Sequence, residues 1–412
     1  MSSTGPRRVA IIGAALSANK GAAAMVETVV SRLPDTLGEC RFDLLTTYPV
    51  DDAAHVPVGA PVQVTGLEPL RLALVEFPVA CLVLVCRVLH LPTGWVRARG
   101  CRSILRSSVV VDVAGISFVD GRGIPITVYN ALMTGLPILL GVPVVKAAQA
   151  LGPFRTRLNR TLARIVLPRT AAICARGERT RDHLADLGLE NVVEVADLAF
   201  SLDDSGGLPD GARDALAHVD GGYLVVMPSA VVRGIRESNG ADYVDEVATL
   251  VRRLRRATGL AVVIAPHSYR AGRPEDRMND GPVCREVVAR IADDPLVVGL
   301  DMDLSAGQLR ALIAGSRLLV TSRFHAMISG LATCTPTIVV GWSHKYREVL
   351  ADFGMEEMGM DSTVLTDPDR IVSLVADCLA DRESIAGRIG AALPAVQAKS
   401  SRNFDVIAAA AR

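Results

Sequence analysis

The stretch RVAIIG at residues 8–13, followed after a short turn by GAAAMVETVVSRL at residues 21–33, decides the fold class. The first run is short, apolar and ended by glycine, as expected of a buried strand, whereas the second has the composition and length of a helix. A strand, a turn and a helix in this order open a doubly wound α/β domain. We therefore expect Rossmann-like parallel sheets covered by helices.

The same alternation continues along the chain. Further apolar, β-branched runs occur at residues 42–49, 108–115, 142–152, 171–178, 192–200, 223–229, 260–268, 296–300, 317–322 and 336–342. The polar loop DDSGGLPDG at residues 203–211 separates two groups of these runs. We expect an N-terminal Rossmann-like domain over residues 1–205 and a C-terminal one over 206–412, whose last helices could pack back on the first. Two such domains facing a cleft form a glycosyltransferase-B-like architecture, with ligands at the carboxyl ends of strands.

The composition limits the function classes. Among 412 residues, 44 are basic and 44 acidic, so no net field favours nucleic acid or an acidic polymer. Hydrophobic residues make up 50% but aromatic residues only 4%, which suits parallel strands buried on both faces. The eight cysteines show no C-x-x-C spacing, so we expect no metal site and a cytoplasmic location. The cysteines are residues 40, 81, 86, 101, 174, 284, 334 and 378.

The apolar segment at residues 69–91 is about as long as a membrane span. Arg71, Glu76, Pro78 and Arg87 interrupt it, so a complete span is not expected. Two interpretations stay open. The segment is a buried or half-buried helix of a soluble fold, or it lies with an apolar face on the inner surface of the plasma membrane, where the arginines after it would favour anionic lipids.

The strongest constellation of polar residues is LLVTSRFHAM at residues 318–327. A buried strand ends at Ser322, Arg323 and His325 follow, and a helix begins at about Ala326. The guanidinium fork and the helix N-terminus suit a carboxylate or phosphate, and His325 could act as a general acid. Three other residues follow strands in the same domain and could line the same site: His267, His344 and Lys345. Loop capping by Arg323 and His325 is the simpler alternative.

Polar residues also follow strands of the first domain. Asn19 and Lys20 precede a helix, although neither a G-x-G-x-x-G nor a Walker A pattern is present. Gly115, Asp120 and Gln149 occupy other strand ends, where turn chemistry explains them about as well as ligand binding does. Arg176 ends the strand AAICAR, and a surface ion pair is its simpler interpretation.

Five blocks in order resemble the polysaccharide pyruvyl transferase family: NKGAAAM at 19–25, the turn at 112–115, QALGPF at 149–154, ARGERT with Asp197, and SRFHAM with the later HKY. The match reaches from the first strand to about Gly354. The resemblance implies transfer of a pyruvyl group from phosphoenolpyruvate to a sugar of a cell-surface polysaccharide or its lipid-linked precursor, as a cyclic ketal. No further cofactor is implied.

The family's Arg-x-His motif falls on Arg323 and His325, and its first-domain donor arginine falls on Arg176, with Arg179 as a rival because Gly177 follows Arg176. The resemblance implies that the two arginines hold phosphoenolpyruvate while His325 protonates its methylene carbon. The base that activates the sugar hydroxyls is not identified.

Two other functions stay open at this point. A glycosyltransferase of the same shape would use a nucleotide sugar, with Arg323 and Lys345 on the diphosphate. A non-catalytic glycan-binding or membrane-associated scaffold would keep the fold without needing His325.

Overall fold

The computed structural model describes residues 5–203, 206–273, 278–341 and 344–411, and the chain divides into two compact units. The first unit comprises Met1–Ser17, Met25–Leu202 and Gln397–Arg412, and the second comprises Ala18–Ala24 and Asp203–Val396. The main boundary therefore falls in the polar loop after Leu202. Two short segments, at residues 18–24 and 397–412, lie in the other unit from the one that a single boundary at residue 205 would give them.

The first unit is built on a parallel sheet in the order β3-β2-β1-β4-β6-β7-β8, with β5 paired to β6. The strands of this sheet are β1 (Arg7–Ile12), β2 (Cys40–Thr46), β3 (Val62–Gly66), β4 (Val109–Asp112), β5 (Ile116–Ser117), β6 (Val144–Leu151), β7 (Ala172–Arg176) and β8 (Val192–Val195). The central strands β1, β4 and β6 are buried over most of their lengths, which explains their mainly apolar sequences. Gly13 turns the chain after β1 with φ +85°, and any side chain there would overlap Asp112.

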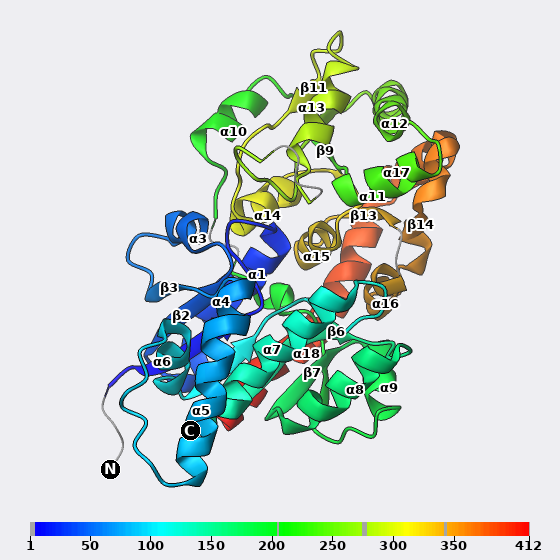
Figure 1. Ribbon diagram of the computed structural model, residues 1–412. Helices are drawn as coiled ribbons and strands as arrows, with labels where there is room; N and C mark the ends of the chain where they lie inside the picture. The colour runs from blue at the N-terminus through cyan, green and yellow to red at the C-terminus, as the bar shows by residue number, and fades with distance from the viewer. Residues whose placement is uncertain (1–4, 204–205, 274–277, 342–343, 412) are drawn as a thin grey trace. The chain divides into compact units, whose positions relative to one another are not determined.

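Helices cover this sheet (Figure 1). They are α1 (Lys20–Arg32), α2 (Pro34–Leu37), α3 (Pro49–His55), α4 (Pro69–Arg71), the π-helix η1 (Leu72–Glu76), α5 (Phe77–Val88), α6 (Arg99–Leu105), α7 (Ile124–Leu140), α8 (Arg157–Val166), η2 (Leu167–Arg169), α9 (Glu178–Ala185) and η3 (Leu198–Ser201). One core cluster joins the sheet to α5, α6 and α7, and another joins it to α8 and α9.

The second unit has a six-stranded parallel sheet in the order β11-β10-β9-β12-β13-β14. The six strands are β9 (Tyr223–Met227), β10 (Ala261–Ile264), β11 (Val297–Gly299), β12 (Leu318–Thr321), β13 (Thr337–Gly341) and β14 (Gly359–Asp361). Counted along the chain, this is the Rossmann strand order, in which the connections change direction between β9 and β12. That reversal creates a crevice for ligands at the carboxyl ends of these two strands.

The helices of the second unit are α10 (Asp210–Leu216), α11 (Ala230–Ser238), α12 (Tyr243–Thr258), α13 (Gly281–Ala289), α14 (Ala306–Ala314), α15 (Phe324–Ala332), α16 (His344–Asp352), η4 (Glu356–Met358), η5 (Ser362–Thr366), α17 (Pro368–Ala380) and α18 (Arg382–Ala410). Local sequence explains several of their ends. The Asp242 carboxylate caps α12 by accepting from the backbone N–H of Asp245 at 3.0 Å, and Gly259 ends that helix in the left-handed conformation. Ser305 and Gln308 form a capping box at α14.

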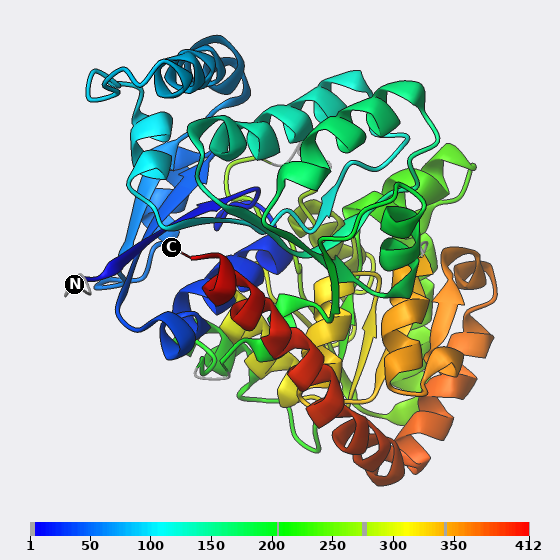
Figure 2. The ribbon, with the colours of Figure 1, turned by 90° about the horizontal axis from the view of Figure 1, so that it is seen from below.

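The C-terminal part of α18 belongs to the first unit, and Figure 2 shows the helix running to a C-terminus near the N-terminal end of the chain. Asn403 accepts from the backbone N–H of Ala148 at 3.0 Å, and Ser400 donates to the carbonyl of Asp197 at 2.8 Å. These bonds satisfy backbone groups of the first-unit loops with side chains from the end of the chain.

Candidate active site

Ser322 and Arg323 follow β12 directly, so they lie where the connections of the second sheet change direction. Ser322 donates its backbone N–H to Met227, the last residue of β9, at 3.0 Å. Its carbonyl accepts from the hydroxyl of Tyr346 at 3.0 Å, and its side chain bonds to Tyr243. Because both tyrosines are buried, these bonds fix the backbone on which Arg323 and His325 are mounted.

Arg323 is the N-cap of α15, is only 8% exposed, and forms an ion pair with the fully buried Asp280. Its Nη2 also donates to the carbonyl of Met278 at 3.2 Å. Asp280 in turn accepts from the backbone N–H of Ala230 at 2.8 Å and from that of Ser268 at 2.9 Å. The ion pair therefore joins the start of α15 to the start of α11 and to the loop after β10.

Burial and charge oppose each other at this pair. Burial raises the pKa of Asp280, although Arg323 and two backbone donors favour its charged form. Burial alone would lower the pKa of Arg323, but Asp280 more than offsets this, so the pKa of Arg323 is raised. Since two buried charges depend on each other here, the pair holds the local structure rigidly.

The imidazole of His325 packs against the backbone at the start of α1. A Cβ on Gly21 would overlap this ring, so only glycine allows the approach. Phe324 packs edge-on against the same ring, with centroids 5.2 Å apart. His325 is thus held at the first turn of α15 and beside the first turn of α1, where two helix N-termini offer partial positive charge.

Lys20 is the first residue of α1, and its side chain is 3% exposed and forms an ion pair with Asp303, whose side chain is 29% exposed. Asn19 accepts from the backbone N–H of Gly21 at 2.9 Å, and Ser268 donates to the carbonyl of Ala18 at 3.2 Å. These contacts explain why residues 18–24 belong to the second unit. The structure therefore brings Lys20 together with the Arg-x-His motif within the second unit.

His267, in the loop after β10, is buried at 4% exposure. Burial lowers the pKa of His267 well below its ordinary value, and the charges of His325, Arg323 and Lys20 lower it further. The ring is therefore neutral at physiological pH. The uncharged ring of His267 therefore lies near the side chains of His325, Arg323 and Lys20.

Lys345 lies on α16, with its Nζ 5.0 Å from the ring centroid of Phe324 and 5.4 Å from that of Tyr346. This cation–π arrangement places a positive charge next to the start of α15. His344 begins α16, but its side chain lies outside what the structure describes.

A buried ion pair also lies at the end of β7 in the first unit. Arg176, the last residue of β7, donates to Asp197 at 2.7 Å and to the carbonyl of Gly115 at 3.1 Å. Arg179, its rival in the sequence, is exposed on α9. Position and burial thus favour Arg176 over Arg179 as the residue that organises these loops.

Asp120 and Gln149 are engaged in structural hydrogen bonds. Burial would raise the pKa of Asp120, but donors from Thr156, Arg155 and Asn159 lower it overall. Gln149 is fully buried, donates to the carbonyl of Asp112 at 2.7 Å and accepts from Ser117 at 2.6 Å. These contacts stabilise the loops, and acceptor binding by the two residues stays a prediction.

Sequence reasoning missed the carboxylates that pair with the cations, Asp280 and Asp303. Both lie in loops far from their partners along the chain, and no motif marks either of them. It also missed Lys146, which is fully buried, bonds to Asp112 at 2.5 Å and lies within a strand that otherwise looks apolar. A lysine inside a buried strand was the one available signal, since such a charge needs a partner.

Solved structures with the same fold share little sequence with this chain. UDP-GlcNAc 2-epimerase from Neisseria meningitidis aligns with a TM-score of 0.62 at 9% identity, covering 97% of this chain and 99% of that one. A putative UDP-N-acetylglucosamine 2-epimerase from Listeria monocytogenes gives 0.58 at 12% identity, covering 94% and 91%. A trehalose-6-phosphate synthase gives 0.55 at 10% identity, covering 97% of each chain. The expected glycosyltransferase-B-like fold is confirmed.

Sequence comparison is more specific about function. The Amylovoran biosynthesis protein AmsJ of Erwinia amylovora is 22% identical over 306 residues, which cover 69% of this chain and 68% of that protein. The family model for polysaccharide pyruvyl transferase matches residues 19–344, a range that begins at Asn19 and includes the Arg-x-His motif. The chain therefore belongs to the polysaccharide pyruvyl transferase family.

Proposed function

We propose that this pyruvyl transferase uses phosphoenolpyruvate as the donor and forms a cyclic ketal on two hydroxyls of one sugar. In this reaction the donor's methylene carbon gains a proton and becomes a methyl group. Two C–O bonds form at the neighbouring carbon, and the bond from that carbon to the phosphate oxygen breaks. The two sugar hydroxyls lose one proton each. One of these protons restores the general acid, the other leaves with the phosphate, and the atoms balance.

One observation carries the proposal: Lys20 and His325 lie together at the first turns of α1 and α15. Two helix N-termini and an ammonium group suit a donor that has both a phosphate and a carboxylate. The imidazole beside them can deliver a proton to a bound donor.

The ion pairs suggest distinct roles for the two cations. Asp280 is fully buried and bonded to two backbone N–H groups, so Arg323 has little freedom to leave it. Asp303 is partly exposed, so water can hydrate it when Lys20 turns to a donor phosphate. Lys20 is accordingly the clamp in this proposal, and Arg323 is the positioning residue that holds α15 and thereby His325. This differs from the direct clamp expected of Arg323.

The test is to incubate purified protein with phosphoenolpyruvate and oligosaccharides from bacterial exopolysaccharides, following phosphate release and the mass of the sugar product. We expect equal amounts of phosphate and ketal. His325→Gln should lower the rate by about a hundredfold or more, as for loss of a general acid. His55→Gln, a change of the same kind at an exposed histidine, should leave the rate unchanged.

Turnover of a nucleotide sugar without phosphoenolpyruvate would replace this proposal with the glycosyltransferase alternative. Full ketal formation by His325→Gln would refute the role of His325 while leaving the donor assignment in place.

We also propose that the reaction takes place in the cytoplasm. All eight cysteines are free, and most are buried, which suits a reducing compartment. Cell fractionation tests this location, and recovery of the protein from the medium or the periplasm would contradict it.

A further inference from the structure

The helical run α4–η1–α5 in the first unit exposes an apolar face. Its inner side is buried against the core through Leu72, Ala80, Val83 and Cys86. Its outer side carries leucines and valines whose exposed fractions reach 76% at Leu70. The exposed set comprises Leu70, Leu74, Val75, Leu82, Leu84, Val85 and Val88, and Leu89, Leu91 and Trp95 continue it beyond the helix. Monomeric soluble proteins rarely leave such a continuous apolar face in water.

This run is long and apolar enough to span a bilayer, but its packing argues against a span. Glu76 is fully buried on the inner side, and Arg87 donates to the carbonyl of Leu140 at the end of α7. A helix that is tied on one side to the protein core and apolar on the other is suited to lie at a membrane surface. Figures 1 and 2 show α5 at the periphery of the first unit.

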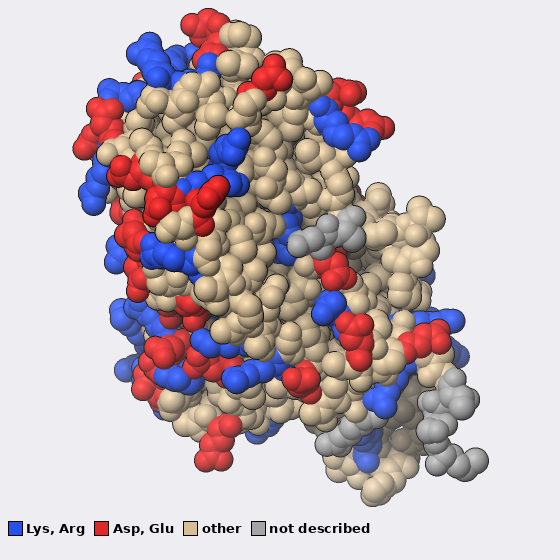
Figure 3. Space-filling model, turned by 180° about the vertical axis from the view of Figure 1, so that it is seen from behind, with Lys and Arg blue, Asp and Glu red and all other residues tan. Residues whose placement is uncertain are grey.

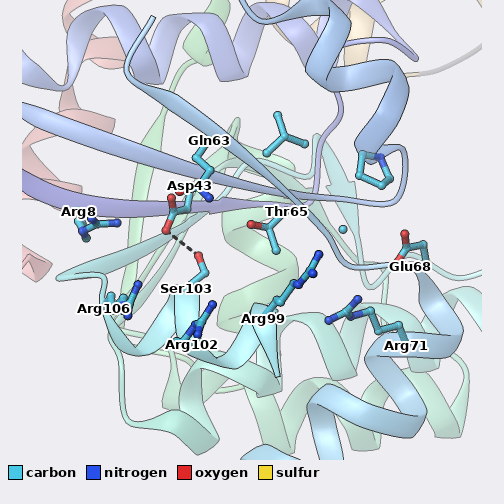
Figure 4. Close-up of a pocket in the computed structure, with 13 residues that line it drawn as sticks. Arg8, Asp43, Gln63, Thr65, Glu68, Arg71, Arg99, Arg102, Ser103 and Arg106 are labelled. Carbon is cyan, nitrogen blue, oxygen red and sulfur yellow. Dashed lines mark hydrogen bonds between the residues drawn. The ribbon is translucent and has the colours of Figure 1, made fainter. Parts of the chain in front are cut away.

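A basic pocket of about 520 Å³ adjoins the start of this helical run. Arg99 and Arg102 line it from α6, Arg106 from the residue that follows this helix, Arg71 from α4 and Arg8 from β1, as Figure 4 shows. Two carboxylates, Asp43 and Glu68, are also in the lining, and Asp43 accepts from Ser103 at 2.8 Å. The lining has five arginines and two carboxylates, and Arg71 also pairs with Glu76, so the pocket keeps a net positive charge and has room for a phosphate group.

Glu76 joins the basic pocket to the apolar helix. Its carboxylate accepts from the backbone N–H groups of Gly100 and Cys101 at 3.1 and 2.8 Å, at the start of α6. It also accepts from Nε of Arg71 at 3.0 Å. One buried carboxylate therefore holds the arginine-bearing helix in a fixed position beside the apolar one.

We propose that this pocket binds the phosphate of an anionic lipid headgroup while the outer face of α4–η1–α5 enters the membrane interface. Apolar side chains and arginines are the two chemistries that a membrane surface with anionic lipids recognises together. Trp95 and the exposed leucines after α5 extend the apolar side of this surface. Figure 3 shows the face opposite to that of Figure 1, over which Lys and Arg side chains are interspersed with Asp and Glu.

The test measures binding of the purified full-length protein to vesicles by co-sedimentation. Vesicles of phosphatidylcholine alone are compared with vesicles that also contain phosphatidylglycerol. We expect stronger binding to the anionic vesicles and weakening by added salt, since surface charges are screened. The triple variant Arg99→Gln, Arg102→Gln, Arg106→Gln should lose about a hundredfold in affinity, because each arginine near an anionic surface contributes about fivefold.

Two matched controls separate the site from general effects. The first removes the same number of positive charges at exposed positions outside the pocket: Arg256→Gln, Arg370→Gln and Arg402→Gln. The second uses Val58→Asp, a change at an exposed valine in a loop, as the control for Leu74→Asp and Val85→Asp on the apolar face. Only the pocket and apolar-face variants should weaken vesicle binding, with unchanged circular dichroism.

Equal binding to neutral and anionic vesicles would overturn the proposal, and so would unchanged binding by the triple variant. Release of the protein from vesicles by low millimolar inorganic phosphate would show a site for soluble phosphate instead. Because the readout is binding and not pyruvyl transfer, the result is independent of the proposed donor.

Discussion

Replacing Arg323 by methionine should destabilise the second unit strongly. The substitution keeps an extended apolar side chain but leaves Asp280 charged, fully buried and without its guanidinium partner. Removing one member of a buried ion pair costs about 3–5 kcal/mol in proteins. Asp280 keeps two backbone N–H donors, so we expect about 3 kcal/mol, near the lower end of that range.

The structure offers a matched control in the same unit. Arg285 and Asp301 form an ion pair at 2.9 Å, but both side chains are nearly half exposed, at 46% and 45%. Arg285→Met should cost less than about 1 kcal/mol, because water solvates the carboxylate that remains. The two variants make the same chemical change and differ in the burial of the partner.

Urea unfolding followed by circular dichroism gives the free energy of unfolding, and hydrogen exchange of peptides from β12 and α15 locates the loss. Lowering the pH from 7 towards 5 should narrow the gap between Arg323→Met and wild type, because Asp280 can then take up a proton and its burial no longer costs a charge. A loss below about 1 kcal/mol for Arg323→Met, or an equal loss for Arg285→Met, would refute this account of the pair.

Three further predictions concern the site. Gly21→Ala should lower both the rate of phosphate release and the stability of the protein, because the added methyl group would overlap the ring of His325. The control Gly234→Ala, at an open position in a helix, should stabilise the protein by about 0.5–1 kcal/mol. Equal effects of the two variants in thermal unfolding would contradict the close packing at Gly21. Lys20→Met should raise the KM for phosphoenolpyruvate by about tenfold or more, as for loss of a charged hydrogen bond, and an unchanged KM would remove Lys20 from the donor site. The pKa of His267 is lowered on folding, so as the pH falls below about 6.5 the unfolded chain takes up a proton at this residue before the folded chain does. In urea unfolding, wild type should therefore lose up to about 2 kcal/mol of stability by pH 5, and His267→Gln should lose less. An imidazolium NMR signal for His267 at pH 6 would refute this.

The alternation of buried strands and helices could be predicted from the sequence, because it depends on the composition of short consecutive segments. Runs such as LLVT at β12 and YLVVM at β9 are almost entirely apolar, so their composition alone indicates buried strands. In this fold class ligands bind at the carboxyl ends of strands. The sequence therefore placed Arg323 and His325 at a strand end, and the family that the five blocks indicate is confirmed. The catalytic role of the motif stays a prediction.

The partners of these residues were not predictable. Asp280 and Asp303 meet Arg323 and Lys20 only because loops after different strands converge at one edge of the second sheet. An isolated aspartate in a loop has the same local sequence signal whether it is solvated or buried against a cation.

The segment at residues 69–91 shows the same division. Its sequence determined that a long apolar helix forms, but not which side of it faces the core. The tertiary structure decided that Glu76 points inward to cap α6 and that Leu74 and Val85 remain exposed. Local sequence thus determined the secondary structure and the motif positions, whereas burial, charge pairing and exposed faces were decided by contacts between residues distant in the chain, because the free energy of those contacts depends on neighbours that only folding supplies.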